Sequence, residues 1–205
     1  YRELDDAVQE MESDADVRAV VFTGKGDRAF SAGADIHEMK RAVDNPDPPN
    51  PEPGSRWYAW RIAACKKPTI GAINGLAYGG GAVMASSFDI RVGCERTSFK
   101  FLAASYGRVN STWSLPTQVG WPVAKELLFT ARVVEAEEAY RIGLLNHLVP
   151  SETLMPRAKE IAAQIAANDP RMVQGIKGLM IRDVGARWEQ MYTNELEARE
   201  GELRP

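Results

Sequence analysis

The sequence has few of the residues that crosslink small proteins or bind metal ions. It contains two cysteines, Cys65 and Cys94, which lie far apart and form no CxxC pair. This usage suits a reduced, cytoplasmic protein better than a disulfide-rich secreted one. The two histidines, His37 and His147, lack the spacing of metal ligands. We therefore expect no metal site and no resident cofactor.

Long hydrophobic runs and a strong charge imbalance are also missing. No apolar run approaches the roughly 20 residues that span a bilayer, and no signal-peptide pattern precedes the first helical segment. A net charge of -3 gives no reason to expect nucleic acid or an anionic membrane as a partner. With 205 residues, 44% of them hydrophobic, and no internal sequence repeat, one domain with one substantial core is expected.

The most informative stretch is 67–89, KPTIGAINGLAYGGGAVMASSFD. It predicts a strand at 69–73 and a turn at 74–75. The three glycines at 79–81 follow, and they open a predicted small-residue helix at 82–87. Glycine lets the backbone approach a ligand closely, and the start of a helix directs free N–H groups at it. The same pattern also fits a plain strand-to-helix connection without a site.

A second glycine-bearing stretch, FSAGADIHEMK at 30–40, favours the functional interpretation. It follows an apolar run at 17–23 that predicts a buried strand, and it leads into a helical pattern. The chain therefore offers two sets of backbone N–H groups for one oxygen atom. Two such donors are what an oxyanion hole requires.

These segments resemble a known family. FTGKGDRAFSAGADIHEMK followed by KPTIGAINGLAYGGG is similar to the paired signature of the crotonase, or enoyl-CoA hydratase/isomerase, superfamily, and KELLFTARVVEAEEAYRIGLLNHLVP extends the match. The resemblance implies an α/β fold with a crotonase-like ββα spiral core at 1–150. Residues 151–205 would form a C-terminal helical trimerisation region of the same domain. Family members place two strands and a turn before the first helix, so part of their CoA-binding surface is expected to be missing from this sequence.

The resemblance also implies a site for an acyl-CoA thioester. The N–H groups of Ala34 and Gly80 would form the oxyanion hole, and the segment of Ala34, Asp35, Ile36 and His37 would lie along the CoA adenine and pantetheine. Arg28 and His37 stand where basic residues meet CoA phosphates, although both also fit ordinary surface charges. Asp35 additionally fits a helix-capping role. The implied assembly is a homotrimer or a dimer of trimers.

The sequence departs from the family where hydration chemistry needs two carboxylates. Those positions carry Val83 and Ala103, neither of which can move a proton. A replacement would come from 103–117, and its polar or aromatic candidates are Tyr106, Asn110, Ser111, Thr112 and Trp113. Each of them also fits a core or turn position.

Several activities therefore stay open. The first is a lyase or isomerase of the family, acting on acyl-CoA in fatty acid metabolism by stabilising a thioester enolate or oxyanion. Decarboxylation of a malonyl-type thioester needs mainly the oxyanion hole, and methylmalonyl-CoA decarboxylases are similar in KELLFTA and GLLNHLV, but their motif histidine is Ala34 here. A dehalogenase or thioesterase would need a nucleophile near Ser111. A non-catalytic acyl-CoA binder is the alternative of another class.

The remaining patterns predict the rest of the secondary structure. An amphipathic helix opens the chain, the proline-rich stretch 44–55 is a loop or a lid, and a helix covers 56–66. Its aromatic residues Trp57, Tyr58 and Trp60 are expected in the core or an interface. Further strands are predicted at 90–92 and 144–149. Helices are predicted at 123–130, 135–142, 153–168, 170–182, with Asp169 as cap, and 186–203.

Overall fold

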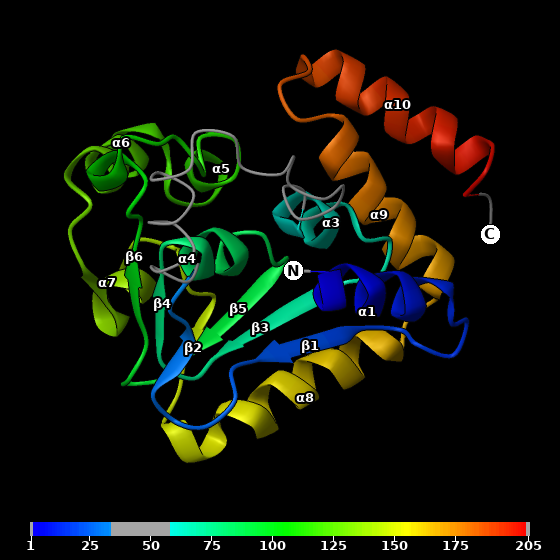
Figure 1. The fold of residues 1–205 in the computed structure, drawn as a ribbon. Coiled ribbons are helices and arrows are strands. Elements are labelled where there is room, and N and C mark those ends of the chain that lie inside the picture. The colour runs from blue at the N-terminus through cyan, green and yellow to red at the C-terminus, as the bar shows by residue number, and fades with distance from the viewer. Residues whose placement is uncertain (1, 34–57, 204–205) are drawn as a thin grey trace.

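The structure, a computed structural model, describes residues 2–33 and 58–203 (Figure 1). The strands are β1 (Val20–Thr23), β2 (Ala29–Ser31), β3 (Thr69–Ile73), β4 (Leu76–Tyr78), β5 (Ile90–Gly93), β6 (Ser98–Lys100), β7 (Val134–Glu135) and β8 (His147–Leu148). The helices are α1 (Arg2–Ser13), α3 (Tyr58–Ala64), α4 (Gly80–Ala85), α5 (Leu115–Val119), α6 (Trp121–Thr130), α7 (Ala136–Arg141), α8 (Leu154–Ala166), α9 (Pro170–Arg182) and α10 (Trp188–Glu200). Two short 3₁₀ turns are η1 (Ala104–Tyr106) and η2 (Ser151–Thr153).

The described strands form two four-stranded sheets, and the chain alternates between them. One sheet has the order β1-β3-β5-β8 and the other β2-β4-β6-β7. All neighbours are parallel except β6 and β7. Each of the first three strand pairs along the chain contributes one strand to each sheet. The segments that follow β2, β4 and β6 therefore leave the second sheet at the same edge.

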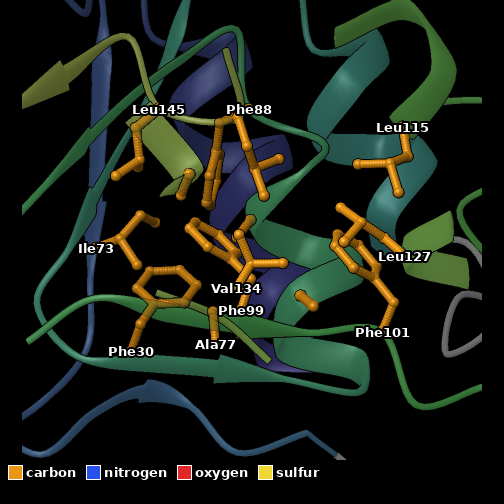
Figure 2. Packing of buried hydrophobic residues seen from close by; sticks show 14 of the residues in the cluster. Phe30, Ile73, Ala77, Phe88, Phe99, Phe101, Leu115, Leu127, Val134 and Leu145 are labelled. Atoms are coloured by element: carbon orange, nitrogen blue, oxygen red, sulfur yellow. The ribbon is translucent and has the colours of Figure 1, made fainter. Parts of the chain in front are cut away.

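The main core lies where the two sheets meet helices α1 and α3 to α7. It contains aromatic and aliphatic side chains from both sheets, including Phe30, Ile73 and Phe99 (Figure 2). Phe30 packs edge-on against Phe88, with ring centroids 5.9 Å apart. Figure 2 also shows Phe101, Leu115 and Leu127 gathered at the side of this core, where α5 and α6 cover it.

A second core lies on the opposite face of the first sheet. Ile70 and Val92 of the sheet pack there against Leu154, Ala158 and Ile161 of α8, which runs beneath the strands in Figure 1. The sheet is thus covered on both faces, which explains why β3 is buried along its whole length. Lys177 of α9 is tied to the same region by its Nζ atom, which lies 2.7 Å from Asp89 Oδ2.

The long, strongly patterned elements agree with the sequence prediction. The predicted boundaries of β3 and α9 are confirmed, and Asp169 caps α9 by accepting hydrogen bonds from the N–H groups of Arg171 and Met172 at 2.8 and 3.3 Å. The strand predicted at 90–92 is one residue longer. Helices α6, α7, α8 and α10 differ from their predicted ranges by up to three residues at each end, and α3 ends at Ala64 rather than 66.

Three predicted boundaries are wrong for identifiable reasons. The strand predicted at 17–23 begins at Val20, because the N–H of Val17 is turned to Asp14 O. The helix predicted at 82–87 begins two residues earlier, at Gly80, and it ends at Ala85, because the Ser87 N–H donates to Met84 O, three residues back. The strand predicted at 144–149 is limited to β8, at 147–148. At its start, the Leu145 N–H donates to Ala139 O in α7 and is not available to a neighbouring strand.

Four short strands and one helix were not predicted. The strands β2, β4, β6 and β7 have two or three residues each, and α5 has five. Such lengths carry too little periodicity to be recognised. Within residues 2–33 and 58–203, no helix is long and apolar enough to cross a lipid bilayer.

Candidate functional site

The two glycine-bearing corners lie beside each other because β2 and β4 are parallel neighbours. Both corners follow their strands at the same edge of the sheet, Gly33 after β2 and Gly79 after β4. A Cβ atom on Gly33 would lie 2.8 Å from Tyr78 O and 2.9 Å from Gly80 N. The main chain of the first corner therefore touches the main chain of the second, and only glycine fits at position 33.

The second corner has a backbone conformation that favours glycine. Gly79 has φ 53° and ψ -119°, and Gly80 is the first residue of α4. The carbonyl oxygen of Gly80 accepts a hydrogen bond of 3.1 Å from the Tyr58 hydroxyl of α3. Gly81 approaches β2 closely, since a Cβ atom there would lie 2.1 Å from Ser31 O. The position of Gly80 is thus fixed by backbone contacts and by the Tyr58 hydroxyl.

A cavity of about 510 Å³ opens next to this corner. Its described lining comes from α3, α4 and the segment before α5: Tyr58, Ala59, Trp60, Val83, Val109, Asn110, Ser111, Thr112 and Trp113. The volume lies in the range typical of small-molecule sites. None of these nine residues is charged, so the described wall can enclose an apolar group and offers hydrogen bonds only from a few neutral groups.

The segment 109–113 carries the polar part of this wall. Ser111 is 1% exposed and has φ 54°, an unusual conformation for a residue with a side chain. Its Oγ atom and the Oδ1 atom of Asn110 are buried without a hydrogen-bond partner among the described residues. Thr112 and Trp113 are exposed in part at the rim, and the Trp113 ring packs edge-on against Trp60 with centroids 5.9 Å apart.

The structure brings together some of the predicted site residues and separates others. Asn110 and Trp113 line the cavity. Ser111 and Thr112, two further candidates for replacing a carboxylate, line it as well. Tyr106 lies in η1, is 53% exposed and is not among the described lining residues. Arg28 lies in the turn before β2 with an exposed side chain. Ala34, Asp35, Ile36 and His37 fall outside the described residues.

The structure places Val83 and Ala103, the two positions where the family resemblance led us to expect carboxylates, differently. Val83 is a buried residue of α4 and faces the cavity. Ala103 precedes η1, accepts hydrogen bonds from the N–H groups of Tyr106 and Arg108, and is not among the described lining residues. The apolar side chain of Val83 therefore lies on the cavity wall itself.

The sequence interpretation missed the cavity residues on α3, namely Tyr58, Ala59 and Trp60. Tyr58 and Trp60 were expected in the core or an interface, but both line the cavity, and Trp60 is 46% exposed. Helical spacing of aromatic residues could not separate a core face from a cavity face, since both are apolar. Trp57 lies outside the described residues.

None of the nine described lining residues is an Asp, Glu, His, Cys, Lys or Arg. In the described ranges, no three His, Cys, Asp or Glu side chains are grouped in a way that could hold a metal ion. Partial burial and the nearby Arg157 cation lower the pKa of His147 below its usual value. This histidine lies on β8, in the sheet that does not carry the glycine corners.

Comparison with solved structures identifies the architecture. An enoyl-CoA hydratase from Bacillus anthracis superposes with a TM-score of 0.87 and 29% sequence identity, covering 100% of this chain and 80% of that one. An enoyl-CoA hydratase described as putative, from Streptomyces coelicolor, gives a TM-score of 0.84 at 27% identity, covering 98% and 77%. The predicted α/β crotonase-like fold is confirmed.

Sequence comparison gives the family. The model of the enoyl-CoA hydratase/isomerase family matches residues 1–200. A short-chain-enoyl-CoA hydratase of Clostridium acetobutylicum is 39% identical over 84% of this chain and 67% of its own length. A crotonyl-CoA hydratase of Syntrophomonas wolfei is 38% identical over 80% of this chain and 64% of its own. The chain belongs to the enoyl-CoA hydratase/isomerase family, and it spans about two thirds of the length of these relatives.

Proposed function

We propose that this protein is an enzyme that binds acyl-CoA thioesters and stabilises the negative charge that develops on the thioester carbonyl oxygen. The N–H groups of Gly80 and Ala34 are the proposed donors. The observation that carries the proposal is the contact between Gly33 and the Gly80 amide, since Ala34 is the residue that follows Gly33. Two donors aimed at one oxygen stabilise an enolate or a tetrahedral oxyanion in a site that is already polarised.

The cavity beside Gly80 supports this assignment as the place of the acyl group. Its described wall is uncharged and rich in aromatic residues, which suits an acyl chain better than the phosphates of CoA. The relatives named above are hydratases of enoyl-CoA and crotonyl-CoA. A lyase or isomerase acting on acyl-CoA is therefore the reaction class that fits the family and the cavity together.

The proposed reaction is not hydration by the usual pair of carboxylates. Val83 occupies one carboxylate position on the cavity wall, Ala103 occupies the other, and no Asp or Glu is among the nine described lining residues. Since the oxyanion donors are backbone groups, their function does not depend on either side chain. We assign the protein to chemistry that begins when the oxyanion hole polarises the thioester carbonyl, because this polarisation makes the α-C–H bond more acidic.

The residues of the cavity wall bear differently on the two alternatives, a malonyl-type decarboxylase and a non-catalytic acyl-CoA binder. A malonyl-type decarboxylase must hold a substrate carboxylate, and no Lys, Arg or His is among the nine described lining residues. A non-catalytic acyl-CoA binder is favoured by the apolar residue at Val83, because binding needs no proton carrier. Exchange of α-hydrogens separates the enzyme from the binder, because only an enzyme that forms the enolate and carries a proton incorporates deuterium.

The test combines binding, exchange and one backbone change. Butanoyl-CoA is incubated in D₂O with the protein, deuterium at the α-carbon is followed by mass spectrometry, and CO₂ release from malonyl-CoA is measured in parallel. Gly80→Pro removes the donor N–H at the first helical position, where proline is tolerated. We expect a loss of about 100-fold or more in turnover.

The matched variant Gly80→Ala retains the amide. A folded Gly80→Pro protein that binds and exchanges as well as Gly80→Ala would contradict the assignment of this N–H group. Tight binding of butanoyl-CoA without exchange would favour the binder, and CO₂ release from malonyl-CoA would favour the decarboxylase.

A further inference from the structure

Two polar groups on the cavity wall have no partner within the described structure. Asn110 Oδ1 and Ser111 Oγ are both buried and unpaired there. A buried polar group without a hydrogen bond destabilises a protein, so such groups in a folded chain call for an explanation. Nearby buried serines are satisfied: Ser86 Oγ donates to Val83 O at 3.0 Å and lies 3.3 Å from Ser114 Oγ.

The backbone at Ser111 is also held in an unfavourable conformation. Its φ of 54° falls in the left-handed region, which costs free energy for any residue other than glycine. Ser111 O accepts a hydrogen bond of 3.1 Å from the Leu115 N–H, and this contact anchors the strained residue to the start of α5. Strain and an unpaired hydroxyl therefore coincide at one residue of the cavity wall, as expected for a residue that contacts a ligand.

The rest of the wall indicates the shape of that ligand. Trp60 and Trp113 form an edge-to-face pair with an interplanar angle of 70°, and Tyr58 lies on the same helix as Trp60. Aromatic side chains present flat apolar surfaces that favour offset or edge-on packing with another ring. A ligand that reaches from these rings to Asn110 and Ser111 needs a flat apolar body and a polar tip.

We propose that the cavity accepts an aromatic acyl group that carries a hydroxyl, which hydrogen-bonds to Asn110 and Ser111. This substrate class rests on the proposed function, because it assigns the acyl group of the thioester to this cavity. A hydroxyl both donates and accepts, so it can donate to the Asn110 carbonyl oxygen and accept from the Ser111 hydroxyl. A carboxylate would only accept, and no cation is among the nine described lining residues to neutralise it.

The test measures dissociation constants by calorimetry for phenylacetyl-CoA and its 2-, 3- and 4-hydroxyphenylacetyl counterparts. The wild-type protein is compared with Ser111→Ala, Asn110→Leu and the control Ser105→Ala, an exposed serine outside the described lining. We expect at least one hydroxylated thioester to bind about tenfold tighter than phenylacetyl-CoA. The preference should persist in Ser105→Ala and disappear in Ser111→Ala and Asn110→Leu, with folding verified by thermal unfolding.

The possible failures are distinguishable. If phenylacetyl-CoA binds and no hydroxylated counterpart binds more tightly, the substrate class is wrong while the acyl-CoA site stands. The same holds if the preference survives both cavity substitutions. If neither butanoyl-CoA nor any of the four aromatic thioesters binds, the proposed function itself is wrong, and the inference that rests on it is overturned with it.

Discussion

Buried polar side chains near the ends of β3 and β5 differ from those on the cavity wall. Asn74, which follows β3, is 7% exposed and makes three hydrogen bonds to the backbone of Gly24 and Gly26. Thr97 Oγ1 donates to Ile73 O and accepts from the Cys94 N–H. On the cavity wall, by contrast, Asn110 Oδ1 and Ser111 Oγ are unpaired within the described chain.

Buried amide and hydroxyl groups thus have different roles in these two regions. Near the sheet, amide and hydroxyl groups satisfy backbone atoms at the turns between strands, so their value is structural. On the cavity wall the same groups satisfy nothing in the described chain and therefore lower its stability. The comparison leads to opposite expectations for substitutions that look alike in the sequence.

The largest effect is expected at Asn74. Asn74→Ala leaves the N–H and C=O of Gly24 and the C=O of Gly26 without their partner, so the free energy of unfolding should fall by about 3 kcal/mol. Urea denaturation measures it. The control is Asn168→Ala, an exposed asparagine with one hydrogen bond to Gln164 O, which should cost under about 1 kcal/mol. Equal losses would contradict the structural role assigned to Asn74.

The next effect concerns the ion pair that ties α9 to the sheet. Lys177 is 9% exposed, and its Nζ atom donates to Asp89 Oδ2 at 2.7 Å and to Lys67 O at 3.2 Å. Lys177→Met keeps the volume but leaves the Asp89 carboxylate without its cation, so stability should fall by about 2 kcal/mol, a figure reduced for the partial exposure of Asp89.

The exposed pair of Arg157 and Glu160, at 2.8 Å, provides the comparison for Lys177. Arg157→Met should change the free energy of unfolding, measured by urea denaturation, by less than about 0.5 kcal/mol. If both substitutions lowered the free energy of unfolding by the same small amount, the pair of Lys177 and Asp89 would stabilise the fold no more than an exposed ion pair does.

A smaller effect, of opposite sign, is expected on the cavity wall. Ser111→Ala removes an unpaired hydroxyl and keeps the backbone strain unchanged, so it should raise stability by about 1 kcal/mol. Ser86→Ala is the matched change, because this serine is also buried but bonded to Val83 O, and it should lower stability by about 1 kcal/mol. Thermal unfolding of the two variants decides it, and a destabilised Ser111→Ala would mean that the hydroxyl has a structural partner.

The smallest effect concerns pH. Because burial lowers the pKa of His147 in the folded state, the unfolded chain binds a proton more readily, so this residue stabilises the fold above its unfolded pKa of about 6.5. That contribution should be lost as the pH falls through the lowered folded pKa. His147→Gln should therefore flatten the fall in stability between pH 7 and 5, measured by urea denaturation. An unchanged slope would show that His147 does not contribute to it.

The sequence predicted the long elements and failed on the short ones. β3 has five consecutive buried residues and α9 begins with an Asp-Pro cap, so both have strong local signals. The second sheet consists of strands with two or three residues, whose pairing depends on the first sheet bringing them together. That tertiary dependence explains why no strand was predicted at 29–31 or at 76–78.

The candidate site was predictable in parts. Glycine patterns and the family resemblance singled out Gly80, and the departure at Val83 directed attention to residues 103–117. Nothing in the pattern could distinguish Ser111, which lines the cavity, from Tyr106, which is exposed outside its described lining. That distinction depends on the η1 turn and on the left-handed residue at 111, neither of which has a sequence signature at a non-glycine position.

The contact between Gly33 and Gly80 has a consequence for how this protein tolerates change. The contact joins main chain to main chain, and its position is set by the pairing of β2 with β4, including the irregular register between Ala29 and Ser31. Exchanging side chains on the surrounding surface leaves such a contact in place, whereas adding or deleting one residue between a strand and its corner would displace it. The side chains that line the pocket can therefore change, while Gly33 and the lengths of the two segments cannot change without displacing the contact.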